Sequence, residues 1–431
     1  MSDTVAPVVA SRPDRIAVPP ASTVRRLVGR PVGAAWGDQR LLADLVDVAD
    51  HDDPSPIAEV WYGAHARHPA WVTDGGTRVA ADALAEHEQP GPLVKLLAAA
   101  GPLSIQVHPD AASARRRWDE EEAAGIPRDA PARRSADPLA KPELVRAVGS
   151  FRALCGFRPA VASRALLSAL VPHGAEPLLE HLALGDAGLG SAVDALLRSD
   201  PASVGAILDA VAAGARDVLA APTEGSAAPE AMLERLAELA LDLVERFPGD
   251  PGVLVALLLE DVDLAPGDTL FVAPGTPHAY LSGLAVEVMA SSDNVLRGGM
   301  TTKPIDVDAF LEALDARAVG APRTGTLPRR VDGSGWRRHI IPSDAFLIDE
   351  AEIDGVLLTE RMGECPSVVL CVSGEVEVSS AGSATIDLRA GGAALLAPGP
   401  TPVEVRGRGL VLHVGTARRP GAPSPALSPE G

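Results

Sequence analysis

The order of hydrophobic and polar positions predicts a chain that is rich in strands at both ends and helical in the middle. The clearest strand is SIQVHPD (104–110), in which Ile105 and Val107 alternate with polar residues. Because side chains on a strand repeat every two residues, Gln106 and His108 lie on the same face. A carboxamide and an imidazole are costly to bury without partners, so this face needs polar partners from elsewhere in the chain.

Further strands are predicted on both sides of the central block. Residues 22–110 are predicted to form short strands and turns, with a short apolar helix within 86–100. Strands are expected again over residues 253–290, and once more over 335–416.

Residues 160–247 are rich in Ala and Leu and carry a helical pattern. In EAMLERLAELALDLVERF the apolar positions recur at steps of three or four residues: Met232, Leu236, Leu239, Leu243 and Phe247. The sequence PGDPG (248–252) then breaks the helix. We therefore predict a helical domain inserted between strands, with no catalytic constellation of its own.

Two segments repeat each other at a constant offset of 124 residues. APGDTLFVAPGTPHAY (265–280) aligns with RAGGAALLAPGPTPVEV, so that Gly267 matches Gly391 and Gly275 matches Gly399. A Gly, an apolar run and Pro-Gly are typical of the turns of jelly-roll or cupin β-barrels. At this offset His278 aligns with Pro402. We therefore expect two such barrels, of which only the first is equipped for chemistry.

These patterns give a mainly β fold with a helical insertion: two cupin/jelly-roll-type β-barrels plus an α-helical domain. The expected divisions are a disordered tail (1–21), a catalytic cupin-type domain (22–158 and 251–330), a helical insertion (159–250), a C-terminal cupin-like domain without metal ligands (331–417) and a second disordered tail (418–431).

Composition limits the classes of partner. The 431 residues carry a net charge of −20, which argues against binding to nucleic acid or an anionic membrane. The three cysteines form no CxxC pair, the N-terminus has no apolar signal region, and no apolar run approaches the ~18–20 residues of a membrane span. We expect a cytoplasmic monomer. An anionic substrate would require a local cluster of Arg and Lys.

Four nitrogen and oxygen donors form a candidate metal site: Gln106, His108, Glu143 and His278. Glu143 lies in KPEL, and His278 follows the barrel turn PGTPH. This set suits a borderline divalent cation, zinc first, with a position left open for water or substrate. For any one histidine, the alternative is a structural role in the core.

The segment after His278 holds further charged candidates. If Ser282 and Gly283 formed a two-residue hairpin turn, Glu287 would lie across from His278 on the same face. Asp293 is either a site residue or a turn residue. The cationic residues Arg297 and Lys303 either bind an anion or are solvated loop charges.

Several motifs, in the same order, resemble the type I mannose-6-phosphate isomerase (phosphomannose isomerase) family. They are AAWG, EVWYGAH, LSIQVHPD, KPEL, FRALCGFRP, PGDPG, PGTPHAYLSG and VEVMASSDNVLRGGMTTK. The resemblance implies one zinc ion per chain, bound by Gln106, His108, Glu143 and His278. It also implies interconversion of mannose 6-phosphate and fructose 6-phosphate through an enediolate.

The same resemblance assigns the remaining site residues. It places Lys141, Ser104, Arg297 and Lys303 at the sugar-phosphate site and gives family counterparts for Tyr280 and Glu287. With the mechanism considered, we predict Ser104, Tyr280 and Lys303 as substrate-binding residues and Arg297, Glu287, Lys141 and Asp293 as catalytic residues. The general base could be Glu287, Lys141, Asp293 or a metal-bound water. One departure lies beside the site, since AKPE has Ala140 where many members of the family have His.

Two other classes compete with the isomerase. A cupin-type iron oxygenase would use two His and one carboxylate, but it would leave Gln106 and the cluster of Lys141, Arg297 and Lys303 unexplained. A non-catalytic sugar-binding barrel would bind sugar phosphate without turnover, and Ala140 gives that alternative some weight.

Overall fold

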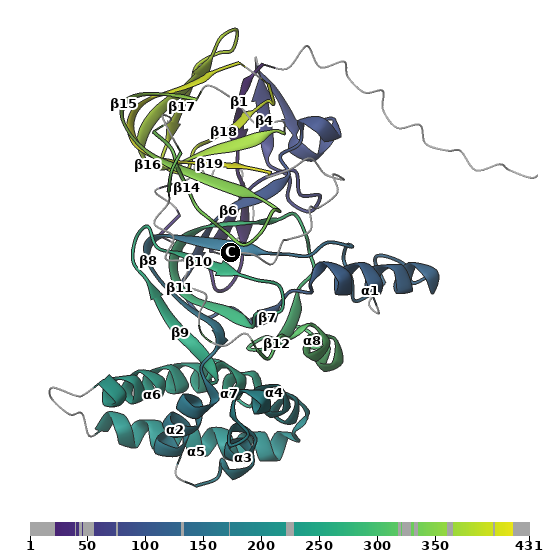
Figure 1. Ribbon diagram of the computed structural model, residues 1–431, viewed down its shortest axis with the longest axis vertical. Coiled ribbons are helices and arrows are strands. Elements are labelled where there is room, and N and C mark those ends of the chain that lie inside the picture. The colour runs from purple at the N-terminus through teal and green to yellow at the C-terminus, as the bar shows by residue number, and fades with distance from the viewer. Residues whose placement is uncertain are drawn as a thin grey trace, which may run out of the picture.

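Two β-sheets and a block of helices succeed one another along the long axis of the molecule in the computed structural model (Figure 1). The C-terminal strands lie at one end, the strands from β6 to β12 in the middle, and helices α2 to α7 at the other end. The structure describes residues 22–38, 40–42, 45, 56–74, 76–130, 133–171, 173–220, 228–317, 320, 329–331, 335–359, 365–399 and 401–416. The predicted tails 1–21 and 418–431 lie outside the described residues.

The middle sheet carries the motifs of the predicted site. Its main path runs, in spatial order, through β10 (Thr269–Val272), β8 (Glu143–Phe157), β11 (His278–Ala290), β6 (Pro92–Ala99), β3 (Ile57–Tyr62) and β2 (Arg30–Gly33). Beside this path, β9 (Leu259–Leu264) pairs with β8, β7 (Ile105–Val107) pairs with β11, and β12 (Leu296–Gly299) pairs with β7.

The second sheet is built mainly from the C-terminal part of the chain. Its order is β13 (Arg329–Arg330), β14 (Arg337–Arg338), β15 (Leu347–Thr359), β19 (Val403–Gly415), β16 (Ser367–Ser380), β18 (Ala393–Leu396), β1 (Val24–Val28), β4 (Trp71–Asp74) and β5 (Thr77–Ala80), with β17 (Ile386–Arg389) beside β16. We expected residues 22–158 in the catalytic domain, but β1, β4 and β5 instead hydrogen-bond into this C-terminal sheet.

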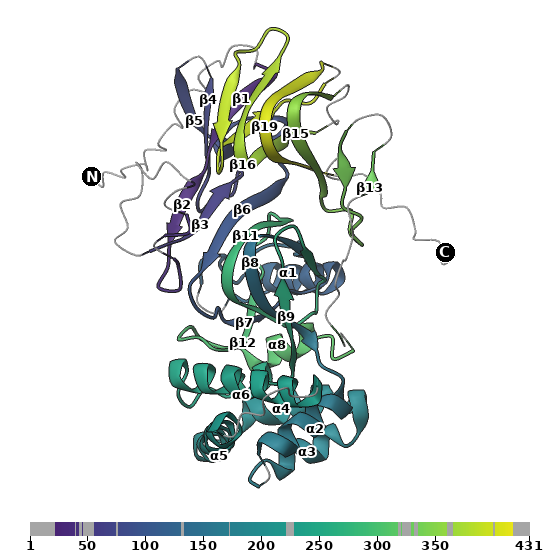
Figure 2. The ribbon, with the colours of Figure 1, turned by 90° about the vertical axis from the view of Figure 1, so that its left-hand side faces the viewer.

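The helices of the predicted insertion follow β8 and precede β9 along the chain. They are α2 (Ala160–Leu170), α3 (Glu176–Leu182), α4 (Leu189–Arg198), α5 (Pro201–Ala220), α6 (Ala228–Arg246) and α7 (Gly252–Ala256). Two further helices, α1 (Ala111–Ala123) and α8 (Val307–Ala313), lie beside the middle sheet (Figures 1 and 2). Asp110 begins α1 as its N-cap, because its side chain accepts a hydrogen bond from the amide of Ser113.

The mainly β fold with helices is confirmed, and the internal repeat is visible in the strand boundaries. Strand β10 (269–272) and strand β18 (393–396) differ by the predicted offset of 124 residues. The turns that precede them contain Gly267 and Gly391, both with positive φ, which is a conformation that favours glycine. The same glycine turn, predicted from the sequence, therefore precedes the matching strand in each sheet.

Two expectations of local structure were wrong. The helix expected within 86–100 is strand β6, and the chain at 252–256 is helix α7 rather than strand. All eight residues of β6 are buried, so the strand is covered on both faces and shows no alternation of apolar and polar positions. A short continuous apolar run does not distinguish a fully buried strand from a helix, and this ambiguity explains both errors.

The two sheets share one apolar core, which joins Val60 and Leu96 of the middle sheet to Leu370 and Leu412 of the C-terminal sheet. Polar contacts cross the same boundary. The buried hydroxyl of Tyr62 on β3 donates a hydrogen bond of 2.5 Å to the carbonyl of Gly391. Such shared burial fixes the orientation of one sheet against the other.

Candidate metal centre and active site

Three side chains from distant parts of the sequence converge at one end of the middle sheet. His108 follows β7, Glu143 begins β8 and His278 begins β11, and their ligand atoms all lie within 4.8 Å of one another. All three residues are buried. Strand pairing brings them together, because β11 pairs with both β7 and β8 and sets His278 opposite Gln106. Among the described residues this is the only such group of His, Cys, Asp and Glu.

Backbone carbonyls orient both imidazole rings. Nδ1 of His108 lies 2.7 Å from the carbonyl oxygen of Asn294, and Nδ1 of His278 lies 3.0 Å from that of Thr276. Each Nδ1 therefore donates its proton to a carbonyl, which leaves the lone pair on Nε2. The two Nε2 atoms face Glu143, at 3.2 Å and 3.5 Å from its carboxylate oxygens. Metal-binding histidines are commonly held in this way.

The donor set fits a divalent metal. Nε2 of His108 is buried and has no hydrogen-bond partner, although a buried polar atom without a partner is costly. Burial lowers the pKa of His108 to about 4, so the ring is neutral near pH 7, which is the form that binds metals. Two imidazoles and a carboxylate suit zinc.

Gln106 lies at the edge of this group and is half-buried. It is opposite His278 in the sheet, and its amide nitrogen donates a hydrogen bond of 3.3 Å to the hydroxyl of Ser104. Gln106, which the alternation in SIQVHPD predicted on the same strand face as His108, therefore lies beside the three converging residues.

Glu143 is held ionised despite its burial. Burial alone would raise its pKa, but Lys141, whose Nζ lies 2.9 Å away, and the histidines hold the pKa well below the usual range. The buried hydroxyl of Tyr280 donates to Oε2 of Glu143 at 3.3 Å. Tyr280 thus contacts the carboxylate of the metal site.

Glu287 does not lie opposite His278. Strand β11 continues through Ser282 and Gly283, so the predicted hairpin is wrong. The pairing of β11 with β8 shifts register on both sides of these two residues, so the irregularity is accommodated within the strand and no turn forms. Glu287 instead pairs with Lys95 on β6, and their side chains lie 3.1 Å apart. Burial raises the pKa of Glu287.

The sequence analysis missed two residues of this region, Lys95 and Glu59. The Nζ of Lys95 lies 3.1 Å from a carboxylate oxygen of Glu59 and 4.6 Å from the centroid of the Trp61 ring. Burial opposes the charge on Lys95, but Glu287 and Glu59 raise its pKa. The available signal was a single lysine within the apolar run PLVKLLAAA, since Lys is almost never buried unless it is paired.

A cavity of about 860 Å³ opens beside Gln106 and contains two of the predicted cations. Its lining includes Ser104, Arg297 and Lys303. Arg297 on β12 is the strand partner of Gln106, so its backbone is adjacent to the metal site. Burial lowers the pKa of Arg297, and the charge of Arg297 lowers the pKa of Lys303. Two neighbouring cations without a carboxylate partner among the described residues suit an anionic ligand.

Asp293 lies near this site and is partly exposed. Its carboxylate is 3.3 Å from Nε2 of His65 and 3.2 Å from Nε of Arg67. Burial would raise its pKa, but His65 and Arg67 hold the pKa below the ordinary value. The side chain of Asp293 is 26% exposed, whereas those of Lys141 and Glu287 are 7% and 5% exposed. Ala140, which precedes Lys141, is half-buried.

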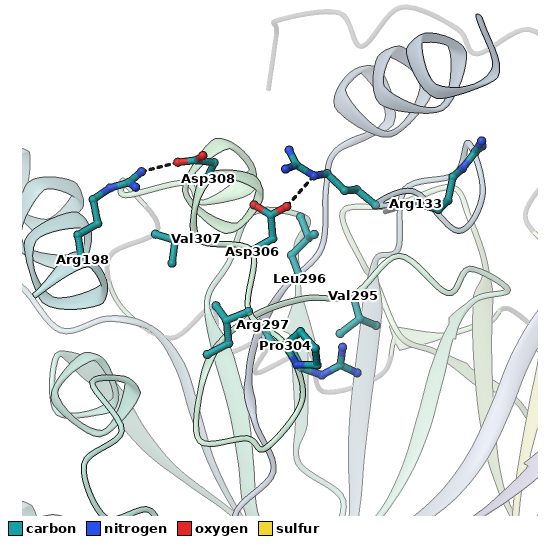
Figure 3. Close-up of a pocket in the computed structure, with 11 residues that line it drawn as sticks. Arg133, Arg198, Val295, Leu296, Arg297, Pro304, Asp306, Val307 and Asp308 are labelled. Atoms are coloured by element: carbon teal, nitrogen blue, oxygen red, sulfur yellow. Dashed lines mark hydrogen bonds and ion pairs between the residues drawn. The ribbon is translucent and has the colours of Figure 1, made fainter. Parts of the chain in front are cut away.

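A second cavity, of about 560 Å³, shares Arg297 with the first (Figure 3). Arg134 in its lining pairs with Asp306 at 2.6 Å, and Arg198 pairs with Asp308 at 2.5 Å. These carboxylates neutralise Arg134 and Arg198, whereas Lys303 and the shared Arg297 of the first cavity have no such partner among the described residues. The first cavity is therefore the better site for an anion.

Comparisons with known proteins agree with this geometry. The family described as phosphomannose isomerase type I, catalytic domain, matches residues 31–160. Mannose-6-phosphate isomerase of Escherichia coli (strain K12) is 31% identical over 407 residues, which cover 91% of this chain and 99% of that protein. The human mannose-6-phosphate isomerase is 29% identical over 395 residues, covering 83% of this chain and 89% of the human protein.

Solved structures are similar over nearly the whole chain. The mannose 6-phosphate isomerase from Salmonella typhimurium bound to fructose 6-phosphate and zinc aligns with a TM-score of 0.76 and 29% identity, covering 92% of this chain and all of that one. A zinc-bound mannose 6-phosphate isomerase aligns with a TM-score of 0.75 over the same share of this chain. In the part of the chain that the structure describes, no helix has the length and apolarity to cross a membrane. The chain is an enzyme that belongs to the type I phosphomannose isomerase family.

Proposed function

We propose that this enzyme interconverts mannose 6-phosphate and fructose 6-phosphate, with one zinc ion per chain. The observation that carries the proposal is the adjacency of two features. A buried His108–Glu143–His278 site lies beside a cavity that holds Arg297 and Lys303 without carboxylate partners among the described residues. A metal-dependent isomerase of a sugar phosphate uses both, because the metal stabilises an enediolate and the cations hold the phosphate. Relatives named mannose-6-phosphate isomerase support the choice of sugar phosphate.

His108, Glu143 and His278 would hold the zinc ion, with Gln106 as the fourth ligand. The unpartnered Nε2 of His108 and the position of Gln106 opposite His278 support this assignment. When bound, zinc supplies Lewis acidity, which stabilises negative charge on the substrate oxygens O1 and O2. Lys141 and Tyr280 orient the Glu143 carboxylate through their contacts with it.

Asp293 is our candidate for the general base that moves the proton between C2 and C1. A base must come within hydrogen-bond reach of that proton; Asp293 precedes Asn294, whose carbonyl contacts His108, and it is more exposed than Lys141 or Glu287. His65 and Arg67 hold its carboxylate ionised, so it is able to accept the proton from C2 and return it to C1. Glu287 is bound to Lys95, and we assign it a positioning role behind Tyr280 and Glu143.

The phosphate would bind to Lys303 and Ser104 in the cavity. Arg297 lies closer to the metal site, as the strand partner of Gln106, and there it balances the charge of the enediolate. Binding of the remote phosphate orients C1 and C2, which lowers the entropic part of the barrier.

A coupled assay of mannose 6-phosphate turnover, with metal analysis of the same sample, tests the proposal. Dialysis against a chelator should abolish turnover, and zinc should restore it. Full activity in metal-free protein would refute the zinc role. Oxygen consumption with bound iron, and no isomerisation, would support the oxygenase alternative instead.

The residue roles have a separate test. Arg297→Ala should lower kcat/KM on the order of a hundredfold, as expected for the loss of a preorganised positive charge. Arg164→Ala removes an exposed arginine of the helical block and should change nothing. Asp293→Asn should lower kcat strongly with little change in KM and full zinc content, because its role is in proton transfer. Unchanged kcat would remove Asp293 from the mechanism.

A further inference from the structure

We propose that Arg246, the last residue of helix α6, is a phosphate-contacting residue and makes the helical insertion part of the substrate site. The inference rests on the proposed function, since it names a further contact for the anionic group of that substrate. This arginine falls within the helical segment EAMLERLAELALDLVERF, where the sequence gave it no role, and the insertion itself was predicted to lack catalytic chemistry.

The end of α6 forms part of the wall of the 860 Å³ cavity. Arg246 and the following Phe247 both line it, together with Ser104, Arg297 and Lys303. Figure 2 shows α6 at the face of the helical block that is nearest to β7 and β12. The cavity therefore lies between the middle sheet and the helical insertion.

The turn after α6 is fixed against the segment that carries Lys303. Asp250 accepts hydrogen bonds from the amide of Gly252 at 2.7 Å and from the amide of Thr301 at 3.3 Å. Gly252 and Gly299 approach so closely that a Cβ atom on Gly252 would lie 2.4 Å from the Cα of Gly299. These contacts hold the end of α6 close to the segment that carries Lys303.

The guanidinium of Arg246 is held in place by one hydrogen bond from its Nε. Its Nε donates to Asp242 one turn earlier at 2.7 Å, and its Nη1 lies beside Gly101, where an added Cβ would be 3.1 Å away. The side chains of Arg246 and Asp242 are 48% and 46% exposed. An exposed pair of this kind contributes little to stability, so an entering dianion competes with it readily.

The charge of the cavity favours the same conclusion. Its lining contains three cations, Arg246, Arg297 and Lys303, and one carboxylate, Glu59, which is bound to Lys95. A chain with a net charge of −20 repels anions at long range, so a concentration of positive charge in one cavity is informative. Arg134 and Arg198 of the neighbouring cavity are each paired with an aspartate, as Arg246 is with Asp242, but only in the 860 Å³ cavity does the paired arginine lie beside Lys303 and Arg297, for which no carboxylate partner is found among the described residues.

The test compares Arg246→Ala and Arg246→Lys with wild-type enzyme in the zinc-loaded form. For Arg246→Ala we expect KM for mannose 6-phosphate and the competitive inhibition constant of inorganic phosphate to rise together, about tenfold, with kcat within twofold. Arg246→Lys keeps the charge and should recover most of the loss. Arg164→Ala, an equal change of charge on the exposed surface of α2, should leave both constants unchanged.

The outcomes separate this inference from the proposed function. If wild-type enzyme isomerises the sugar phosphate but Arg246→Ala leaves both constants within twofold, the inference is wrong and the function stands. A fall in kcat together with a lower melting temperature would assign Arg246 a structural role and also overturn the inference. If wild-type enzyme lacks isomerase activity, the function fails, and calorimetric titration with inorganic phosphate still tests whether Arg246 binds this anion.

Discussion

The two copies of the internal repeat have the same turns and strands but different chemistry. In the middle sheet, Val272 at the end of β10 pairs with Glu143. In the C-terminal sheet, Leu396 at the end of β18 pairs with Ser367. Ser367 thus occupies the position of the metal-site carboxylate, as Pro402 occupies that of His278.

Ser367 belongs to a chain of polar contacts in the second copy. Ser367 lies 2.9 Å from Nε2 of His413, whose Nδ1 is 3.6 Å from Asp349. Asp349 in turn accepts two hydrogen bonds from Arg338. In the first copy, the buried Nε2 of His108 has no hydrogen-bond partner. The comparison teaches that the same strands and turns accommodate either set of side chains, and that the convergence of two imidazoles and a carboxylate distinguishes the first copy.

The largest effect is expected from removing the carboxylate that distinguishes the first copy. Glu143→Gln should lose zinc and lower isomerase kcat/KM on the order of a thousandfold, because the Lewis acid contributes several kcal/mol. The matched change in the second copy, Ser367→Ala, should leave kcat/KM unchanged. Metal analysis and the coupled assay measure both. Equal losses in the two variants would mean that the two copies are not functionally distinct.

A stability effect of about 3 kcal/mol is expected where the two sheets meet. Glu350 on β15 accepts a hydrogen bond of 2.6 Å from buried Arg146 on β8, and Glu350→Gln leaves that guanidinium without its counter-ion. Urea unfolding measures the loss. Glu352→Gln, on the same strand with a side chain 79% exposed, is the control and should change stability by less than about 0.5 kcal/mol.

The contribution of Glu350 should depend on pH. Burial would raise its pKa, but His339 and Arg146 lower it from 4.5 to about 2. A depressed pKa in the folded state stabilises the protein above the unfolded pKa. The difference between wild type and Glu350→Gln should therefore be complete at pH 6 and shrink as the pH falls from 4.5 towards 2. A difference that stays constant over this range would show that the ion pair is not its source.

A smaller effect, about 1 kcal/mol, is expected from Tyr62→Phe. This change removes the hydroxyl that donates to the carbonyl of Gly391 in the repeat turn of the C-terminal sheet and leaves the ring in the core. Urea unfolding should show the loss with zinc content and kcat unchanged. Loss of zinc in this variant would indicate that the turn of the second copy supports the metal site of the first.

No effect on metal content is expected when the second copy is given the carboxylate and the histidine that correspond to Glu143 and His278. In the double variant Ser367→Glu and Pro402→His, zinc should remain at one ion per chain. The first copy also uses His108, which follows a separate strand, β7, that pairs with β11. Metal analysis that found a second zinc ion would show that carboxylate and histidine alone suffice on this scaffold.

Local sequence signals predicted much of the site. The alternation in SIQVHPD and the PGTPH turn identified Gln106, His108 and His278, because both features depend on neighbouring residues only. The offset of 124 residues read from the sequence is the one that separates β10 from β18. Lys95 escaped notice because β6 was interpreted as a helix, and its partner Glu59 lies 36 residues earlier in the chain.

The sequence by itself determined the residue types of the metal site, the turns of both repeats and the helical character of the insertion. These follow from side-chain chemistry and short-range periodicity. Only the tertiary structure decided that β1, β4 and β5 join the C-terminal sheet, that Glu287 faces Lys95, and that Arg246 lines the same cavity as Arg297 and Lys303. The reason is physical: pairing between distant strands and the charge balance of a cavity depend on contacts between residues far apart in sequence.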